Sequence, residues 1–258
     1  MATYLDRILE RHRETAAADM RPLNALASEA LDQGPCRGFT AALRATDGLG
    51  VIAEIKRRSP SKGDLFADLD PVDVARRYER GGAACMSVLT DEEFFGGSAD
   101  DLRTARGAVS MPVIRKDFTV APADIYDARI MGADCILLIA AALDPGELVE
   151  FHALATELGL DVLVEVHDEA ELEVALCADA TLIGVNQRDL VTFEVDHERA
   201  VRMAAEIPDG AVKVAESGVR GTADAAALRA AGYHAVLVGE TLVTSGDPAA
   251  AVQALSRS

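Results

Sequence analysis

Lysine is rare in this chain of 258 residues, in which four lysines stand against twenty-one arginines. Three of them, Lys56, Lys62 and Lys116, lie in short polar segments that follow apolar runs. A guanidinium keeps its proton near neutral pH, whereas the pKa of an ammonium group falls readily when water is removed. We therefore predict that Lys56 and Lys116 donate protons or act as compact charges in a tight site. Lys213, in the run 211–215, is predicted to lie on a solvated face.

Acidic side chains stand at the ends of the same kind of apolar run. Glu54 precedes Lys56 by two residues, so both side chains point to one face of an extended strand. Glu165 and Glu216 end two later runs. A carboxylate inside a hydrophobic strand is unfavourable unless it is paired. Three glutamates that converge with two lysines therefore predict a catalytic cluster.

Small residues end the last two runs. Ser217 and Gly218 follow one run, and Gly239 and Glu240 follow the other. Because these positions lack bulk, backbone N–H groups can approach a ligand there, which is typical of phosphate sites in barrels. The segment 59–63 after the first run, with hydroxyl groups, Lys62 and a glycine, is predicted to be a mobile lid beside the anion.

Short apolar runs alternate with amphipathic stretches beyond residue 50. The predicted strands are 51–55, 85–89, 112–115, 135–140, 162–166, 182–185, 212–215 and 235–238. The predicted helices are 71–80, 99–107, 122–131, 144–158, 168–178, 196–207, 222–231 and 248–255. Strands that are apolar on both faces, each followed by a helix, predict a (β/α)8 TIM barrel. A doubly wound sheet is the alternative fold, but the GxGxxG turn that it would need after the first strand is absent from the sequence.

The chain is predicted to be one TIM-barrel domain, 1–258, made of an N-terminal helical extension, 1–50, and the barrel itself, 51–258. Pro22 should break the extension, and a second helix should end near Leu31. Glycines are expected to end four of the barrel helices, at Gly81, Gly132, Gly159 and Gly232.

The net charge of −18 argues against nucleic acid and anionic membranes as partners. No signal peptide and no apolar run long enough to span a membrane is evident, so a cytoplasmic location is expected. An anionic ligand would need a local basic pocket. Its candidate residues are Lys56, Arg57, Arg58, Lys62, Arg115, Lys116 and Arg188. Of these, Arg57, Arg58 and Arg115 are more simply interpreted as solvated or salt-bridged.

The cysteines and histidines predict no metal site. The four cysteines lack metal-type spacing, and Cys85, Cys135 and Cys177 lie in apolar runs that favour burial. His167 is predicted to have a structural role outside the barrel lumen. The remaining histidines, His12, His152, His197 and His234, are expected to be helical or peripheral and are assigned no function.

Seven segments, in order, resemble the indole-3-glycerol phosphate synthase family of the tryptophan pathway. They are 52–63, 87–98, 113–118, 165–167, 184–190, 215–218 and 238–240. The resemblance implies a substrate that is an anionic sugar phosphate, 1-(2-carboxyphenylamino)-1-deoxyribulose 5-phosphate. The implied products are indole-3-glycerol phosphate, carbon dioxide and water. It implies no cofactor and no metal, and we expect a monomer or weak homodimer, with another tryptophan-pathway enzyme as a possible partner.

The resemblance also implies roles for single residues. Lys116 would be the general acid of ring closure, and Lys56 would pair with the substrate carboxylate. Glu165 would be the acid or base of dehydration, with Lys56 as the competing candidate. The supporting catalytic residues would be Glu54 and Glu216, which hold the lysines, and Asn186, which binds sugar hydroxyls. The substrate-binding residues would be Arg188, Ser59 and the apolar side chains Leu89, Phe95, Phe118 and Leu190. The phosphate would be held by Ser59, Ser217, Gly218, Gly239 and the backbone amide of Glu240, a position that is serine in some relatives.

The sequence leaves other functions open. Phosphoribosylanthranilate isomerase is another phosphate-binding barrel, but it would need a Cys/Asp acid–base pair at strand ends, and no cysteine is predicted there. A Schiff-base aldolase would form a covalent adduct on Lys56 or Lys116. A non-catalytic sugar-phosphate sensor or scaffold subunit would bind the substrate without converting it.

Overall fold

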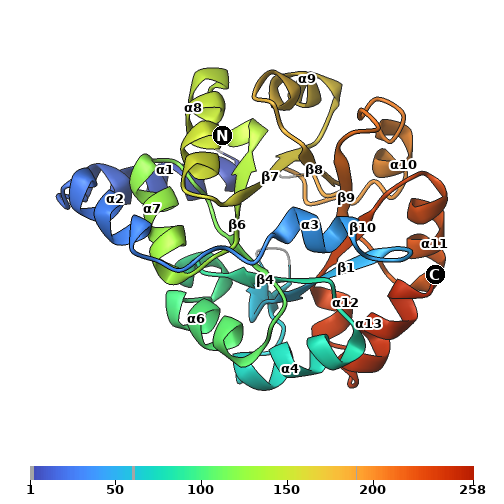
Figure 1. Ribbon diagram of the computed structural model, residues 1–258. Helices are drawn as coiled ribbons and strands as arrows, with labels where there is room; N and C mark the ends of the chain where they lie inside the picture. The colour runs from blue at the N-terminus through green and yellow to red at the C-terminus, as the bar shows by residue number, and fades with distance from the viewer. Residues whose placement is uncertain (1–2, 60–61, 190) are drawn as a thin grey trace.

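The computed structural model describes residues 3–59, 62–189 and 191–258. Eight parallel strands form a closed barrel in the order β1-β10-β9-β8-β7-β6-β5-β4 (Figure 1). The strands are β1 (Gly50–Ile55), β4 (Cys85–Leu89), β5 (Val113–Lys116), β6 (Cys135–Ile139), β7 (Asp161–Val166), β8 (Leu182–Asn186), β9 (Val212–Glu216) and β10 (Ala235–Val238). Nearly every residue of these strands is buried, because helices cover the outer face and side chains fill the lumen. The predicted (β/α)8 barrel is therefore confirmed, and the doubly wound sheet is excluded.

Helices surround the barrel and follow its strands. They are α4 (Pro71–Gly81), α6 (Ala99–Ala108), α7 (Pro122–Met131), α8 (Pro145–Glu157), α9 (Glu169–Cys177), α10 (Arg199–Met203), α11 (Thr222–Ala230) and α13 (Pro248–Ser256). Shorter elements lie at the loops: α5 (Glu92–Phe95), the 3₁₀ turn η1 (Ala140–Ala142), α12 (Glu240–Val243) and the hairpin of β2 (Arg58–Ser59) with β3 (Gly63–Asp64). The prediction of a helix over 196–207 was too long. Ile207 precedes Pro208, which disfavours helical backbone, and residues 204–206 form turns.

The end of α4 shows why two glycines occur in succession. Gly82, with φ of 83°, is the left-handed cap, so the prediction that Gly81 caps this helix was wrong. A Cβ at Gly81 would lie 2.6 Å from the Ala249 carbonyl oxygen. Gly81 therefore permits α4 to pack closely against α13, and Gly82 ends the helix. Gly132 caps α7 as predicted.

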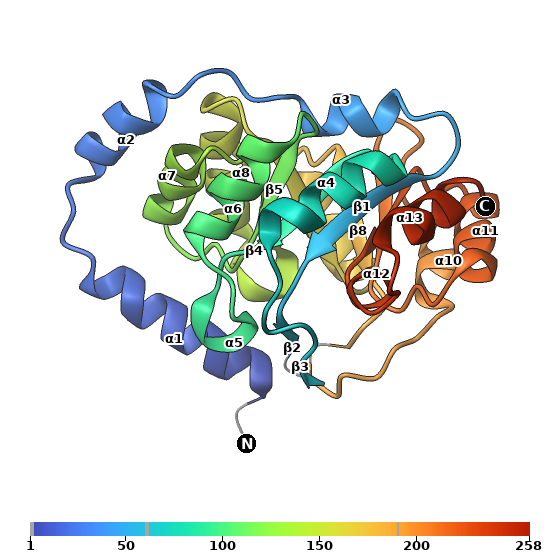
Figure 2. The ribbon, with the colours of Figure 1, turned by 90° about the horizontal axis from the view of Figure 1, so that it is seen from below.

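The N-terminal extension reaches both ends of the barrel. It contains α1 (Tyr4–Ala18), α2 (Leu23–Leu31) and α3 (Phe39–Arg44). Figure 2 shows α1 beside α5 and the β2–β3 hairpin, α2 beside α7, and α3 at the opposite end. The predicted break at Pro22 is confirmed, since Pro22 is the N-cap of α2. The division of the chain into an extension, 1–50, and a barrel, 51–258, within one domain stays a prediction.

Helix α3 closes the N-terminal end of the barrel. Phe39 and Leu43 are buried and pack in one cluster with lumen residues such as Ile52, Ile114 and Leu163. A second and larger cluster lies between the strands and the outer helices. The lumen is therefore a packed core at this end, and space for a ligand can arise only at the other end.

Two predictions about buried residues were wrong. Lys213 is not on a solvated face: it lies in β9, is 7% exposed, and its Nζ donates to the Ala204 carbonyl oxygen at 2.8 Å. Its side chain reaches the turn that follows α10, and this contact leaves it little access to water. Cys177 is exposed because it is the last residue of α9. Cys85 and Cys135 are buried as predicted.

Within the part of the chain that the structure describes, no helix has both the length and the apolar character that crossing a bilayer requires.

The plug formed by α3 can be tested by truncating Phe39, whose side chain is fully buried. We expect Phe39→Ala to lower the free energy of unfolding by about 3–5 kcal/mol, because it leaves a cavity in the lumen. Leu31→Ala is the control, since Leu31 is 69% exposed, and it should change this free energy by less than about 0.5 kcal/mol. Urea unfolding followed by circular dichroism measures both. Equal stability of the two variants would contradict the plug.

Candidate active site

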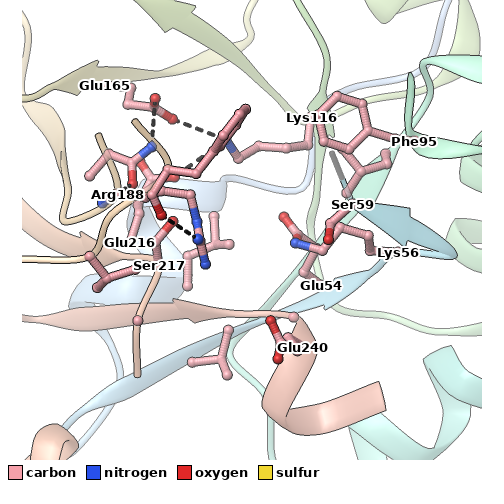
Figure 3. A pocket seen from close by; sticks show the side chains of 18 of the residues that line it. Glu54, Lys56, Ser59, Phe95, Lys116, Glu165, Arg188, Glu216, Ser217 and Glu240 are labelled. Carbon is pink, nitrogen blue, oxygen red and sulfur yellow. Dashed lines mark hydrogen bonds and ion pairs between the residues drawn. The ribbon is translucent and has the colours of Figure 1, made fainter. Parts of the chain in front are cut away.

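A cavity of about 390 Å³ opens at the C-terminal ends of the barrel strands (Figure 3). It is lined by site residues that the sequence predicts, which lie at the ends of seven strands or directly after them: Glu54, Lys56, Ser59, Leu89, Phe95, Lys116, Phe118, Glu165, Asn186, Arg188, Glu216, Ser217, Gly218, Gly239 and Glu240. The remaining predicted residue, Leu190, lies outside the described residues. Fifteen residues predicted from separate segments thus face one space.

Lys116 lies at the centre of this group. Its Nζ lies 3.1 Å from Glu165 Oε2 and 3.4 Å from Glu216 Oε2. Asn186 Nδ2 donates to the other oxygen of Glu165 at 3.0 Å. The second oxygen of Glu216 is buried and has no hydrogen-bond partner in the described chain. One ammonium group therefore joins two buried carboxylates, and one carboxylate oxygen stays free for a proton or a ligand.

These charges shift the pKa values in different directions. Burial lowers the pKa of Lys116, but the charges of Glu165 and Glu216 outweigh burial and raise it above its ordinary value. The sequence argument that desolvation would lower this pKa was therefore wrong. Burial and the Glu165 charge raise the pKa of Glu216 to about 8, against the opposing effect of the Lys116 charge. Burial also disfavours the Glu165 carboxylate, but Lys116 and His167 hold its pKa below the ordinary value. Carboxyl groups with separated pKa values are typical of acid–base sites.

A second ion pair joins the two residues that end the first strand. Lys56 Nζ lies 2.6 Å from Glu54 Oε1, which confirms that both side chains share a face. Glycine makes room for the buried acids on neighbouring strands. A Cβ at Gly239 would lie 2.5 Å from Glu54 Oε1, and a Cβ at Gly184 would lie 2.0 Å from Glu216 Oε1.

The part of the cavity near β9 and β10 has features of an anion site. Ser217 and Gly218 both have left-handed backbone, with φ of 63° and 72°, which is strained for the serine. The buried hydroxyl of Ser59 has no partner in the described chain. Lys62 forms an ion pair with Glu240 across the cavity mouth. The Glu240 carboxylate therefore does not point away from the site, as the sequence argument required, but holds the lysine of the predicted lid.

The opposite wall is aromatic. The rings of Phe95 and Phe118 lie 6.4 Å apart at an interplanar angle of 36°. Helix α1 adds Tyr4, Leu5 and Ile8 to the lining, and these residues were missed in the sequence analysis. The available signal was the helical spacing of Leu5 and Ile8, which indicated only an apolar face without saying what it covers.

Helix α1 is held at the cavity by His12, a residue for which no function was predicted. His12 Nε2 lies 2.9 Å from Asp91 Oδ2 and 3.9 Å from Asp117 Oδ1, and its ring packs against Phe118. Asp91 also accepts from the backbone amides of Phe94 and Phe95 in α5, and Asp117 accepts from Arg115. The three side chains are close enough to share a metal ion, but the carboxylates already have protein partners. We interpret His12 as a tether for α1.

Most of the arginines in the predicted basic pocket are occupied elsewhere. Arg57 pairs with Asp101, Arg58 with Asp64, and Arg115 with Asp117, and none of the three lines the cavity. The salt-bridged interpretation is therefore correct for all of them. Lys56, Lys62, Lys116 and Arg188 lie at the cavity as predicted, and Arg220, which was not predicted, also lines it.

The segment after β8 also contributes residues that the sequence analysis missed. Phe193, Val195 and His197 line the cavity, and the ring of Phe193 contacts Tyr4 edge to face at 5.3 Å. Arg188 Nη1 donates to the Phe193 carbonyl oxygen at 3.0 Å. Because Phe193 has positive φ (61°) in an irregular loop, no periodic pattern could indicate its orientation.

Comparison with known proteins places nearly the whole chain in one family. A family model for indole-3-glycerol phosphate synthase matches residues 5–255. Proteins named indole-3-glycerol phosphate synthase from Rhodopirellula baltica and Mycobacterium avium are 48% and 51% identical to this chain. The first alignment covers 98% of this chain and 98% of the Rhodopirellula protein. The second covers 97% of this chain and 93% of the Mycobacterium protein. The chain belongs to the indole-3-glycerol phosphate synthase family.

The resemblance predicted from seven segments is thus confirmed. The predicted activity is confirmed with it: the protein is an indole-3-glycerol-phosphate synthase, a carbon–carbon lyase of tryptophan biosynthesis.

Two solved structures share only the fold. Thiamine phosphate pyrophosphorylase from Pyrococcus furiosus has a TM-score of 0.61 at 15% identity over 81% of this chain and 94% of its own. N-acetylmannosamine-6-phosphate 2-epimerase from Clostridium perfringens has a TM-score of 0.62 at 11% identity, over 79% of this chain and 91% of its own.

The space at Gly184 provides a test of the Glu216 position in this member of the synthase family. Gly184→Ala would push the Glu216 carboxylate away from Lys116, so we expect kcat to fall by about a hundredfold. Gly210→Ala is the control, because a Cβ there meets nothing within 4 Å. Steady-state kinetics and thermal melting measure both variants. A folded Gly184→Ala protein with the kcat of the control would show that the position of Glu216 does not matter.

The contact between His12 and Asp91, which holds α1 at the cavity, should depend on pH. Burial lowers the pKa of His12, but the hydrogen bond to Asp91 and the charge of Asp117 outweigh burial and raise it. The stabilisation is then fully present below the ordinary histidine pKa and is lost as pH rises through the raised value. We expect His12→Gln to be less stable than the parent by about 1 kcal/mol at pH 6 and equal to it at pH 9. Thermal melting of both proteins from pH 6 to pH 9 measures this difference in stability. A difference that stays the same across this pH range would contradict the charged His12–Asp91 contact.

Proposed function

We propose that this cavity converts 1-(2-carboxyphenylamino)-1-deoxyribulose 5-phosphate to indole-3-glycerol phosphate, carbon dioxide and water, with Lys116 as the acid of ring closure. The contact of the Lys116 ammonium with Glu165 and Glu216 is the observation that carries this assignment. It puts one charged donor and two carboxyl groups within reach of a single small ligand.

The two ends of the cavity suit the two ends of the substrate. The anthranilate ring would lie against Phe95 and Phe118, with Leu89 beside it, because planar rings stack and bury apolar area. The phosphate would lie at Ser217, Gly218, Gly239 and the Glu240 amide, at the start of the short helix α12. The unpartnered Ser59 hydroxyl would donate to it. Lys62 forms an ion pair with the Glu240 carboxylate. When the substrate binds, Lys62 would leave this carboxylate and pair with the phosphate.

Ring closure requires a carbon of the anthranilate ring to attack the ribulose C2 carbonyl. The carbonyl oxygen then gains negative charge, and an ammonium group within hydrogen-bond distance stabilises it and donates a proton. Lys116 is charged in the free site because of its carboxylates. Its proton can be replaced from Glu216, because burial and the Glu165 charge raise the pKa of that carboxyl group. Glu216 is thus assigned a proton reserve as well as an orienting role.

The later steps need the remaining polar groups. Lys56, held by Glu54, would pair with the substrate carboxylate until it leaves as carbon dioxide, with the substrate's own iminium-like ring as the electron sink. Dehydration requires protonation of the new hydroxyl group and removal of a proton from carbon. Glu165 is assigned to this step, since Asn186 and Lys116 fix both of its oxygens. Asn186 would also bind the sugar hydroxyls, and Arg188 would bind the negatively charged substrate. No step of this scheme requires a metal or an organic cofactor.

We further propose that the enzyme acts in the cytoplasm, as a monomer or weak homodimer, and can work beside another enzyme of the tryptophan pathway. The acidic net charge of −18 supports a partner that is neither nucleic acid nor an anionic membrane.

The acid role of Lys116 is tested by Lys116→Arg. A guanidinium keeps the positive charge but does not release its proton, so we expect kcat to fall by more than about a hundredfold. Lys213→Arg is the matched control, because Lys213 lies outside the cavity lining and should keep its turnover. The assay is the fluorescence of the indole product, with purified protein, the carboxyphenylamino substrate and EDTA. Turnover of Lys116→Arg within about tenfold of wild type would remove Lys116 from this role.

A further inference from the structure

The Glu165 carboxylate has a neighbour on the side away from the cavity. His167 directly follows β7, two residues after Glu165, and its Nε2 lies 3.6 Å from Glu165 Oε1. The ring is almost buried, with 12% of its side chain exposed, yet it is not among the residues that line the cavity. The predicted position outside the lumen is therefore correct, but the contact with Glu165 was missed, although the two-residue spacing indicated it.

The other side of the imidazole is held by Glu171 of α9. His167 Nδ1 lies 3.0 Å from Glu171 Oε2, and the backbone amide of His167 donates to the same oxygen at 2.7 Å. Because a carboxylate only accepts, Nδ1 carries a proton. The Glu171 side chain is 22% exposed, so it is open to water. Glu171, His167 and Glu165 form a row from the surface to the cavity wall.

His167 Nε2 is the unsatisfied member of this row. It is buried and makes no hydrogen bond to any residue among 3–59, 62–189 and 191–258, which is rare for a buried polar atom. The separation of 3.6 Å from Glu165 is slightly too long for a hydrogen bond. Contacts of this kind tighten when the substrate is bound. When the imidazole is protonated on both nitrogens, Nε2 is a buried donor beside a catalytic carboxylate, which suggests a role in the reaction.

The proposed reaction needs a supply of protons. The ionised carboxylate of the substrate leaves as neutral carbon dioxide, and its electron pair passes to the ring. The ketone oxygen leaves as water and takes up two protons. Only one is returned, when a C–H bond beside the ring nitrogen breaks to complete the indole. Each turnover therefore takes one proton from solvent, while the bound substrate fills the cavity mouth.

We propose that His167 is a positioning residue that supplies this proton to Glu165 and is refilled from water between turnovers. The imidazolium gives its Nε2 proton to Glu165 Oε1 and becomes the neutral ring, whose remaining proton on Nδ1 is held by Glu171. After the product leaves, water in the cavity returns one proton to Nε2 through Glu165, so that the imidazole ends each cycle with the two ring protons with which it began. This relay rests on the proposed function of the site, and it assigns to His167 and Glu171 a task that neither could perform by contacting substrate.

The charges around the ring agree with this task. Burial lowers the pKa of His167, but the hydrogen bond to Glu171 and the charge of Glu165 outweigh burial and raise it, against a smaller opposing effect of Arg199 from α10. The imidazolium fraction is thus increased at neutral pH, and it declines as pH rises through the raised pKa.

His167→Gln tests the relay, since it keeps a polar side chain of similar length that cannot pass a proton. We expect kcat to fall by about tenfold, with KM changed by less than about twofold, because proton transfer and not binding is impaired. His152→Gln on α8 is the matched control and should behave as wild type. Glu171→Gln should lower the pKa of His167, so that kcat declines with rising pH from a lower value than in wild type.

His167→Ala provides a readout that a purely structural role would not change. Added imidazole should restore its kcat with saturation, and the restoration should follow the imidazolium form. Melting temperature establishes that the variant is folded. If folded His167→Ala and His167→Gln turn over within about twofold of wild type at every pH, or if imidazole restores nothing, the relay is overturned. If wild type itself forms no indole product, the proposed function fails instead.

Discussion

The structure depends on keeping one ammonium group and two carboxyl groups close together where water is largely excluded. Lys116 would be unfavourable there without Glu165 and Glu216, and each carboxylate would be unfavourable without the lysine. The closed barrel meets this requirement because its register aligns the polar strand ends. Leu89 pairs with Lys116 and Asn186 with Glu216 across neighbouring strands. The side chains therefore end at one level of the lumen.

The two ends of the lumen are built for different purposes. At the N-terminal end, Phe39 and Leu43 of α3 fill the barrel and supply stability. At the C-terminal end, glycine at positions 184 and 239 leaves space for acids, and the packing gives way to a cavity. Helix α1 belongs to the same extension as α3, yet it lies at the cavity, where His12 joins it to Asp91. One N-terminal segment thus both closes the core and completes the binding surface.

Much of this could be predicted, for physical reasons that are local. Apolar runs of four to six residues followed by amphipathic stretches gave the strands to within one or two residues at each end. The rule that barrel sites lie at the carboxyl ends of strands then placed the polar residues together. Some wrong predictions had local reasons: Pro208 follows the stretch 196–207, and Gly82 rather than Gly81 caps α4. The reason was not local for Lys213, whose side chain is buried where its Nζ reaches the Ala204 carbonyl oxygen after α10.

The sequence by itself determined the fold, the family and the chemical types at the mouth, since each follows from residue order within a short segment. Only the tertiary structure decided which groups share protons. The pKa of Lys116 rises because carboxylates from two other strands lie within 3.4 Å of its Nζ. The pKa of Glu216 rises to about 8 because its carboxyl group is buried beside Glu165, although the Lys116 charge opposes this rise. The positions of His12 and His167 beside Asp91 and Glu165 were decided in the same way. Electrostatic interaction depends on distance and burial, and neither can be read from the order of residues.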